Sequence, residues 1–226
     1  MAIRWRTDAQ VRLEVEVMTV AADSLRQTTD QRRMTLQEFL TYDDGADQRF
    51  ELVDGILVEM ANESTGNTKI ALLLLEVFFQ IVGRQNVGVK QKIEVKSRYA
   101  TARDPDLIVH TEESADAIEE RDEACLFLNE PNPRAVFEIV SPGDETTLNY
   151  KRDYEHKPRE YADRGIPEMW QVDSVREWVR VGSLVDGEYQ FTTFRADERV
   201  VSSLFPGFDL TVAQILAAGK RAMKKS

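Results

Sequence analysis

The sequence predicts an α/β fold: a mixed β-sheet flanked by helices, with an N-terminal hairpin and a C-terminal hairpin plus helix. Asp-Gly pairs at 54–55 and 186–187 each separate two alternating stretches, which is typical of two-residue β-hairpin turns. Residues 134–141 (RAVFEIVS) form an apolar, β-branched run of the kind found in strands covered on both faces. Helix-like stretches stand between the strands, and this alternation favours a sheet covered by helices.

Composition limits the class of protein. The chain has 226 residues, with 29 Lys and Arg against 40 Asp and Glu, for a net charge of −11. This length predicts a single domain over residues 34–226, preceded by a poorly structured extension at 1–33, for which an edge strand is the alternative. We see no membrane-length apolar run and no secretion leader, so we expect a cytoplasmic protein without a membrane partner. A single cysteine excludes an intrachain disulfide and a cysteine-cluster zinc site, and two histidines leave little for histidine-based metal chemistry.

The first half of the domain alternates between helices and strands. Thr35 caps a short helix over 35–42, with Glu38 in the capping-box position. Residues 49–60 form the first hairpin, and 68–82 are apolar around most of a helix, which predicts burial. Residues 87–97 alternate with period two, which predicts one strand with Ile93 on one face and Lys92 on the other. A short strand at 106–110 and an acidic loop at 111–132, with a helical turn at 113–120, follow.

The second half begins with the covered strand at 134–141, which Pro142-Gly143 terminates. We expect a helix over 147–163 with a kink at Pro158, because proline removes a helix hydrogen bond. A strand at 168–174 and the second hairpin at 177–194 come next. A strand near 199–204 and a helix at 211–219 complete the fold.

Four charged residues are candidates for chemistry. Glu138 lies inside the apolar run 134–141, where a carboxylate is costly unless it is paired or ligates a metal; the alternative is that it reaches solvent. Asp106, Glu51 and Lys157 each have an ordinary reading when taken singly, as a turn residue or a solvated surface residue. Together, three carboxylates could hold Mg²⁺ (or Mn²⁺) and the lysine could stabilise charge on phosphorus. This set predicts metal-dependent phosphodiester hydrolysis.

Four segments resemble the Uma-two family of restriction-endonuclease-like proteins, within the PD-(D/E)xK nuclease superfamily. They are RFELVDG (49–55), DPDLIV (104–109), VFEIVSP (136–142) and DYEHKPREYADRGIPEMWQVD (153–173). The resemblance extends from about residue 34 to the C-terminus. It implies a restriction-endonuclease-like fold, a homodimer, and Mg²⁺-dependent cleavage of DNA by an endonuclease.

The resemblance also implies roles for individual residues. Asp106 matches the PD aspartate, Glu138 the acidic residue of (D/E)xK, and Glu51 the hairpin glutamate. Val140 stands where the lysine of that motif is expected, and Lys157 on the following helix takes its place, with Lys151 as a competitor. Tyr161 matches a helix tyrosine that either contacts a phosphate or packs. Asn67 stands where many relatives have histidine.

The basic residues gather in one segment despite the acidic total. Between residues 84 and 103 there are six Lys or Arg and a single Glu, which predicts nucleic-acid contacts; lysines that protect a strand edge are the alternative. The contacts named from this segment are Lys90, Lys92, Lys96 and Arg98.

Two other functions remain open from the sequence. One is a catalytically inactive restriction-endonuclease-like dimer that acts as a binding or scaffold protein, which Val140 and the acidic composition favour. The other is hydrolysis of a small phosphorylated substrate by the same carboxylates without the basic segment.

Overall fold

The computed structural model describes residues 32–43, 45, 49–60, 64–119, 121–140 and 142–220. The predicted extension at 1–33 lies outside the described residues except for Arg32 and Arg33. Within the described residues the strands form two mixed sheets flanked by helices, which confirms the predicted fold class. The sequence predicted a single sheet, so the division into two sheets is the main difference from the prediction.

The first sheet contains the N-terminal hairpin. Its strand order is β2-β1-β5-β4-β7, which are Ile56–Glu59, Phe50–Val53, Thr101–Arg103, Lys92–Val95 and Cys125–Leu126. The hairpin turn falls at Asp54-Gly55 as predicted, and both residues have positive φ. Strands β5 and β7 were not predicted, because three and two residues are too short to show a period.

The second sheet forms the centre of the molecule. Its strand order is β11-β10-β9-β8-β6-β3, which are Glu188–Arg195, Trp178–Val185, Glu168–Asp173, Ala135–Ile139, Leu107–Val109 and Val87–Gly88. The predicted covered strand is β8, which is buried throughout and runs parallel to β9. The predicted strand at 199–204 is wrong: only an isolated bridge joins Arg199 to Thr211 there.

The predicted strand over 87–97 is divided between the two sheets. Its first part, β3, pairs with β6, whereas β4 pairs with β5 and β7. Lys90 lies between them with a φ of 56°, a left-handed conformation that ends a strand. Within β4 the expected alternation holds, with Ile93 and Val95 buried, but Val89 is 45% exposed.

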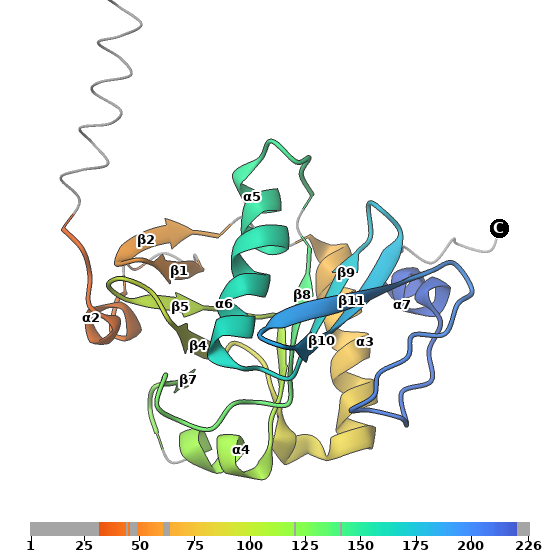
Figure 1. Ribbon diagram of the computed structural model, residues 1–226, viewed down its shortest axis with the longest axis horizontal. Helices are drawn as coiled ribbons and strands as arrows, with labels where there is room; N and C mark the ends of the chain where they lie inside the picture. The colour runs from red at the N-terminus through yellow and green to blue at the C-terminus, as the bar shows by residue number, and fades with distance from the viewer. Residues whose placement is uncertain are drawn as a thin grey trace, which may run out of the picture.

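Helices flank both sheets. They are α2 (Leu36–Leu40), α3 (Thr65–Val82), α4 (Glu112–Glu119), α5 (Leu148–Lys151), α6 (Lys157–Arg164) and α7 (Val212–Gly219), with a 3₁₀ turn η1 (Arg84–Asn86) and a π-helical turn η2 (Arg152–His156). Helix α2 packs against β1 and β5 of the first sheet. Helices α3 and α7 pack together on one face of the second sheet, around Phe78, Phe137 and Trp170. Figure 1 shows α5 and α6 as one column between β1, β2, β4 and β5 on one side and β8 to β11 on the other.

Helix α3 is less buried than its composition predicts. Ile70, Leu74 and Phe78 are fully buried, but Leu72 is 57% exposed, because only one side of this helix contacts the sheet and α7. The sequence predicted no apolar run of membrane length, whereas by length and composition alone α3 could cross a membrane. Here α3 packs against α7 and the strands β3, β6 and β8.

Candidate active site

Glu138 faces helix α6 from the middle of the second sheet. Its strand neighbours Phe137 and Ile139 point into the core beneath α3, while Val136 belongs to the cluster beneath α6. Because side chains alternate along a strand, Glu138 lies on the α6 face, and it is only 4% exposed. The solvent-exposed alternative for Glu138 therefore does not apply.

Two residues of α6, four positions apart, bind the Glu138 carboxylate. The Lys157 ammonium donates to Oε2 at 2.7 Å, and the Tyr161 hydroxyl donates to Oε1 at 2.7 Å. Residues four apart lie on one helix face, so both side chains reach the same carboxylate. Tyr161 is fully buried, and this position makes it a partner of Glu138 rather than a surface contact.

Glu51 joins the same cluster from the first sheet. Lys157 Nζ lies 3.0 Å from Glu51 Oε1, and Arg103 Nη1 donates to Oε2 at 2.8 Å. Arg103 also pairs with Glu160 of α6, at 2.6 Å from Nε to Oε2. Glu51 is fully buried and Arg103 and Lys157 are each 1% exposed. Lys157 therefore links carboxylates that belong to two different sheets. Lys151, its competitor in the sequence, is exposed.

Burial and pairing shift the pKa values in this cluster in opposite directions. Burial alone would raise the pKa of Glu51, but Lys157 and Arg103 outweigh it and lower this pKa to about 2. Burial alone would lower the pKa of Lys157, but Glu138 and Glu51 outweigh it and raise this pKa, so the ammonium stays charged. For Glu138 burial dominates and raises the pKa, with a further contribution from Asp153 and Glu51 against the opposing effect of Lys157.

Asp106 lies at the end of the ladder that contains Glu138. Strands β6 and β8 pair Leu107 with Phe137, so the next position outward places Asp106 beside Glu138. The Asp106 carboxylate accepts the backbone N–H of Ile139 at 2.7 Å, and its own N–H donates to the Phe137 carbonyl at 3.0 Å. Asp106 is half-buried, which makes it the most accessible of the three candidate carboxylates.

The three carboxylates that were predicted to bind one metal ion do not form such a group in the structure. Among the described residues no three His, Cys, Asp or Glu side chains form a group that could hold a metal ion. The physical reason is that the Lys157 ammonium contacts both Glu51 and Glu138. Glu51 is therefore neutralised by cations of the chain itself.

Two buried oxygens near the cluster nevertheless fit a hard cation or its waters. Gln171 Oε1 and Asp104 Oδ1 have no hydrogen-bond partner among the described residues. Gln171 pairs in register with Glu138, and the Asp104 N–H lies 3.3 Å from Glu51 Oε1. Glu138 retains lone pairs beyond the two bonds that it accepts. The donor set of Asp106, Glu138 and an amide oxygen suits Mg²⁺, which binds few protein oxygens and keeps several waters.

The predicted nucleic-acid contacts are not all on the surface. Lys90, Lys96 and Arg98 are exposed, whereas Lys92 is half-buried with its Nζ 5.5 Å from the Phe39 ring centroid. Exposed Tyr99 lies beside this segment, with the Arg33 and Arg98 guanidinium groups over its ring at 4.1 and 5.4 Å.

Sequence reasoning missed several residues of the cluster. Arg103 and Asp104 directly precede the Pro105-Asp106 pair in the sequence. A basic residue next to a predicted metal-binding aspartate is the signal that could have indicated Arg103. Glu160, Asp153 and Gln171 gave none, because a polar residue on a helix or strand is ordinarily solvated.

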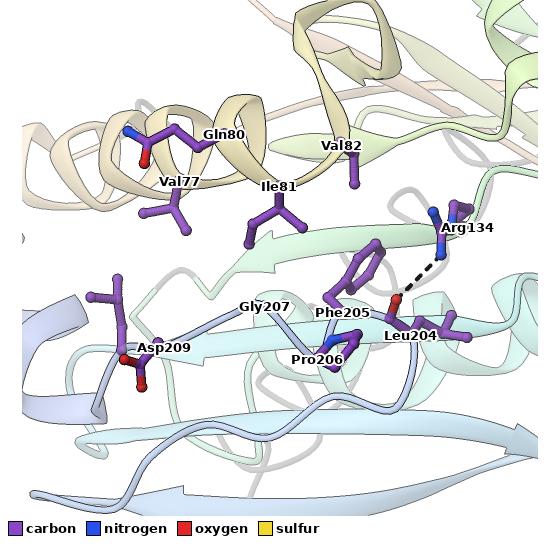
Figure 2. A pocket seen from close by; sticks show the side chains of 11 residues that line it. Val77, Gln80, Ile81, Val82, Arg134, Leu204, Phe205, Pro206, Gly207 and Asp209 are labelled. Atoms are coloured by element: carbon purple, nitrogen blue, oxygen red, sulfur yellow. Dashed lines mark hydrogen bonds between the residues drawn. The ribbon is translucent and has the colours of Figure 1, made fainter.

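The cavity in Figure 2 is separate from this cluster. It has a volume of about 660 Å³ and lies between the C-terminal half of α3 and residues 204–210. Apolar side chains line most of it, and Arg134, which donates to the Leu204 carbonyl, stands at one end. None of the candidate residues borders it.

Comparisons with known proteins identify the family and agree with this fold. The model of the Uma2 family, described as "Putative restriction endonuclease", matches residues 36–213. A solved structure, that of "a putative nuclease belonging to DUF820" from Anabaena variabilis, has a similar fold with a TM-score of 0.61. It is 18% identical, over 83% of this chain and 99% of the other. No curated protein matches the chain.

Proposed function

The chain belongs to the Uma2 family of restriction-endonuclease-like proteins, and from this premise we propose that it is a metal-dependent endonuclease that hydrolyses phosphodiester bonds in DNA. One observation carries the proposal: Glu138, Lys157 and Glu51 form a buried, ion-paired cluster beside Asp106. A buried ammonium and two carboxylates are expensive to keep in a fold, and strongly shifted ionisable groups gather at functional sites.

In this proposal Asp106 and Glu138 hold Mg²⁺ or Mn²⁺, and the amide oxygen of Gln171 lies at the adjacent strand position. A bound divalent ion supplies an acidic water and neutralises negative charge on a phosphate. Glu51 does not take part in binding the ion here, because two cations, Lys157 and Arg103, already neutralise it. Glu138 contacts one cation, Lys157, and a neutral hydroxyl.

The other side chains of the cluster either carry a positive charge towards the site or hold a charged neighbour in place. The raised pKa of Lys157 keeps its ammonium protonated, so it stabilises negative charge that develops on a phosphate at this site. Tyr161 orients the Glu138 carboxylate through its hydroxyl. Arg103, between Glu51 and Glu160, fixes the first sheet against α6 and so holds Glu51 against Lys157.

A second candidate is a catalytically inactive dimer that binds or scaffolds a partner. The observation that favours it is that solvent and substrate have little access to the cluster. Four of its side chains are at most 4% exposed: Glu51, Glu138, Lys157 and Tyr161. Val140, at the usual lysine position, is 2% exposed and apolar. The half-buried Asp106 is the feature that weighs against this candidate.

Cleavage of supercoiled plasmid and of single-stranded DNA, with Mg²⁺ or Mn²⁺, separates the two. The wild type is compared with Asp106→Ala and with Asp163→Ala, a matched control on the exposed side of α6. Nicking by the wild type and by Asp163→Ala, but not by Asp106→Ala, is the expected result. Equal background in all three proteins on both substrates would contradict the endonuclease and favour the binding role.

A further inference from the structure

Proline at position 158 leaves a backbone carbonyl of the preceding turn without its helix donor. In the π-helical turn η2, hydrogen bonds span five residues, and the Lys157 N–H donates to the Arg152 carbonyl. The next bond in this series would run from the N–H of residue 158 to the Asp153 carbonyl. Pro158 has no N–H, so the helix itself cannot supply this bond.

A side chain from the neighbouring sheet supplies it instead. The amide nitrogen of Gln171 donates to the Asp153 carbonyl at 2.6 Å. Gln171 is 1% exposed and lies on β9, in parallel register with Glu138 of β8. The strand next to Glu138 is thereby joined to the turn that immediately precedes Lys157.

Packing alone does not account for a glutamine at this position. Its carbonyl oxygen is buried with no hydrogen-bond partner among the described residues, and an unpaired buried acceptor costs free energy. An apolar side chain of the same length would fill the space without this cost. The bond to the Asp153 carbonyl, which only a donor can make, offsets this cost and uses the amide nitrogen, so the amide oxygen stays available to the cation proposed above.

We propose that Gln171 is a positioning residue of the candidate site, which replaces the hydrogen bond removed by Pro158 and so fixes Lys157 against Glu138. The inference rests on the proposed function only in treating Lys157 and Glu138 as the site. Gln171 acts through the Asp153 carbonyl and the turn η2, not by touching a substrate.

The test compares Gln171→Met, Pro158→Ala and the double variant. Methionine keeps the length of the side chain but cannot donate, and alanine at 158 restores a backbone N–H that can reach the Asp153 carbonyl. Gln190→Met, at an exposed position of β11, is the matched control. The readout is the ¹H–¹⁵N NMR resonance of the Lys157 ammonium, identified by its loss in Lys157→Met, because an ammonium held in a buried ion pair exchanges its protons slowly.

We expect Gln171→Met to broaden or shift this resonance and the double variant to restore it, with no change in Gln190→Met. An unchanged resonance in Gln171→Met, or a defect that Pro158→Ala leaves uncorrected, would overturn the proposal. If Gln171→Met does not fold, recovery of folding in the double variant supports the proposal, and failure to recover overturns it. Wild-type protein that shows the resonance but cleaves no DNA contradicts the endonuclease alone, so the two failures are distinguishable.

Discussion

Lys157 is the residue on which the candidate site depends. It carries a positive charge at a position that is 1% exposed, where it contacts Glu138 and Glu51. Desolvation makes such a cluster a poor source of stability compared with an apolar core, yet removal of one member leaves an uncompensated buried charge. Single substitutions should therefore have large effects.

Lys157→Met should lower the free energy of unfolding by about 3–5 kcal/mol, since it leaves two buried carboxylates without their shared cation. Urea denaturation measures this, and the exposed Lys151→Met is the control, with an expected change within about 0.5 kcal/mol. Mn²⁺ should raise the melting temperature of Lys157→Met more than that of the wild type, because a divalent ion replaces the lost charge. Equal stability of the two lysine variants would show that the ion pairs contribute nothing.

The pH dependence of stability should carry the signature of Glu51. Its pKa in the folded protein is about 2, below the usual 4.5, so its stabilising contribution is present above pH 4.5 and is lost as the pH falls from 4.5 towards 2. The loss amounts to about 3 kcal/mol for a shift of this size.

Glu51→Gln removes that titration and should flatten the acid limb of a stability–pH curve measured by denaturant unfolding. Glu138 titrates in the opposite direction, because burial raises its pKa: its contribution favours the fold at low pH and is lost as the pH rises. Glu51→Gln also removes the Glu51 contribution to the raised Glu138 pKa, so the two curves are compared on the acid limb below pH 4.5, where a carboxyl group whose pKa is raised by burial is already protonated. Parallel curves for the two proteins would contradict the lowered pKa.

At the scale of elements, the two hairpins show how the residues of a turn determine its backbone conformation. Both turns place an Asp and a Gly at positive φ, at 54–55 and at 186–187, as two-residue hairpins with matching twist require. They differ in surroundings, because a Cβ on Gly55 would meet the Arg33 side chain at 2.9 Å whereas nothing lies within 4 Å of one on Gly187.

Gly187→Ala should therefore cost about 1–2 kcal/mol from the left-handed backbone alone, and Gly55→Ala should cost more. Thermal unfolding of the two variants side by side measures the difference. A smaller loss for Gly55→Ala than for Gly187→Ala would mean that the contact with Arg33 does not constrain the first hairpin.

The segment α5–η2–α6 is the element that sequence reasoning described least well. A helix with a kink at Pro158 was expected over 147–163, and the helix is present, but the chain absorbs the proline through a π-helical turn. Such turns are common at functional sites. Here the turn directly precedes the lysine that reaches across to Glu138.

At the scale of the whole molecule, the candidate site is a junction between the two sheets. Glu51 and Arg103 belong to the first sheet, Glu138 to the second, and Lys157 and Glu160 to α6. Ion pairs join all three, so the site and the contact between the sheets are stabilised by the same charges.

Arg103→Met should consequently weaken the junction as a whole, with a loss of about 3 kcal/mol or more because Glu51 loses a buried partner. Hydrogen exchange should also rise in both β1 and α6, which only a coupled junction predicts. The exposed Arg98→Met is the control. A change confined to β5 would argue that the sheets are held together elsewhere.

Binding of DNA by an acidic protein requires a local basic surface. Replacement of Lys90, Lys96 and Arg98 with Gln should weaken affinity for duplex DNA and reduce the slope of log K against log salt by about one per lost phosphate contact. The control changes the same charge at Lys69, Arg195 and Lys220, which are also exposed. Equal losses in both triple variants would show that net charge, not this segment, governs binding.

The sequence alone determined the features that depend on neighbouring residues. Both Asp-Gly turns, the Thr35 capping box, the covered strand of Glu138 and the C-terminal helix are local, because turn chemistry, caps and apolar runs act over a few residues. The family motifs likewise identified Glu51, Glu138 and Lys157, which the fold brings into contact.

Only the tertiary structure decided which partner each charge has. The split of 87–97 between two sheets, the half-exposed α3 and the loss of a strand at 199–204 follow from contacts between distant segments. The same holds for Arg103 beside Glu51 and for Gln171 beneath Asp153. The sequence does not distinguish a solvated charged residue from a paired one. The free energy of the charged form depends on burial and on the opposite charges that the fold places nearby.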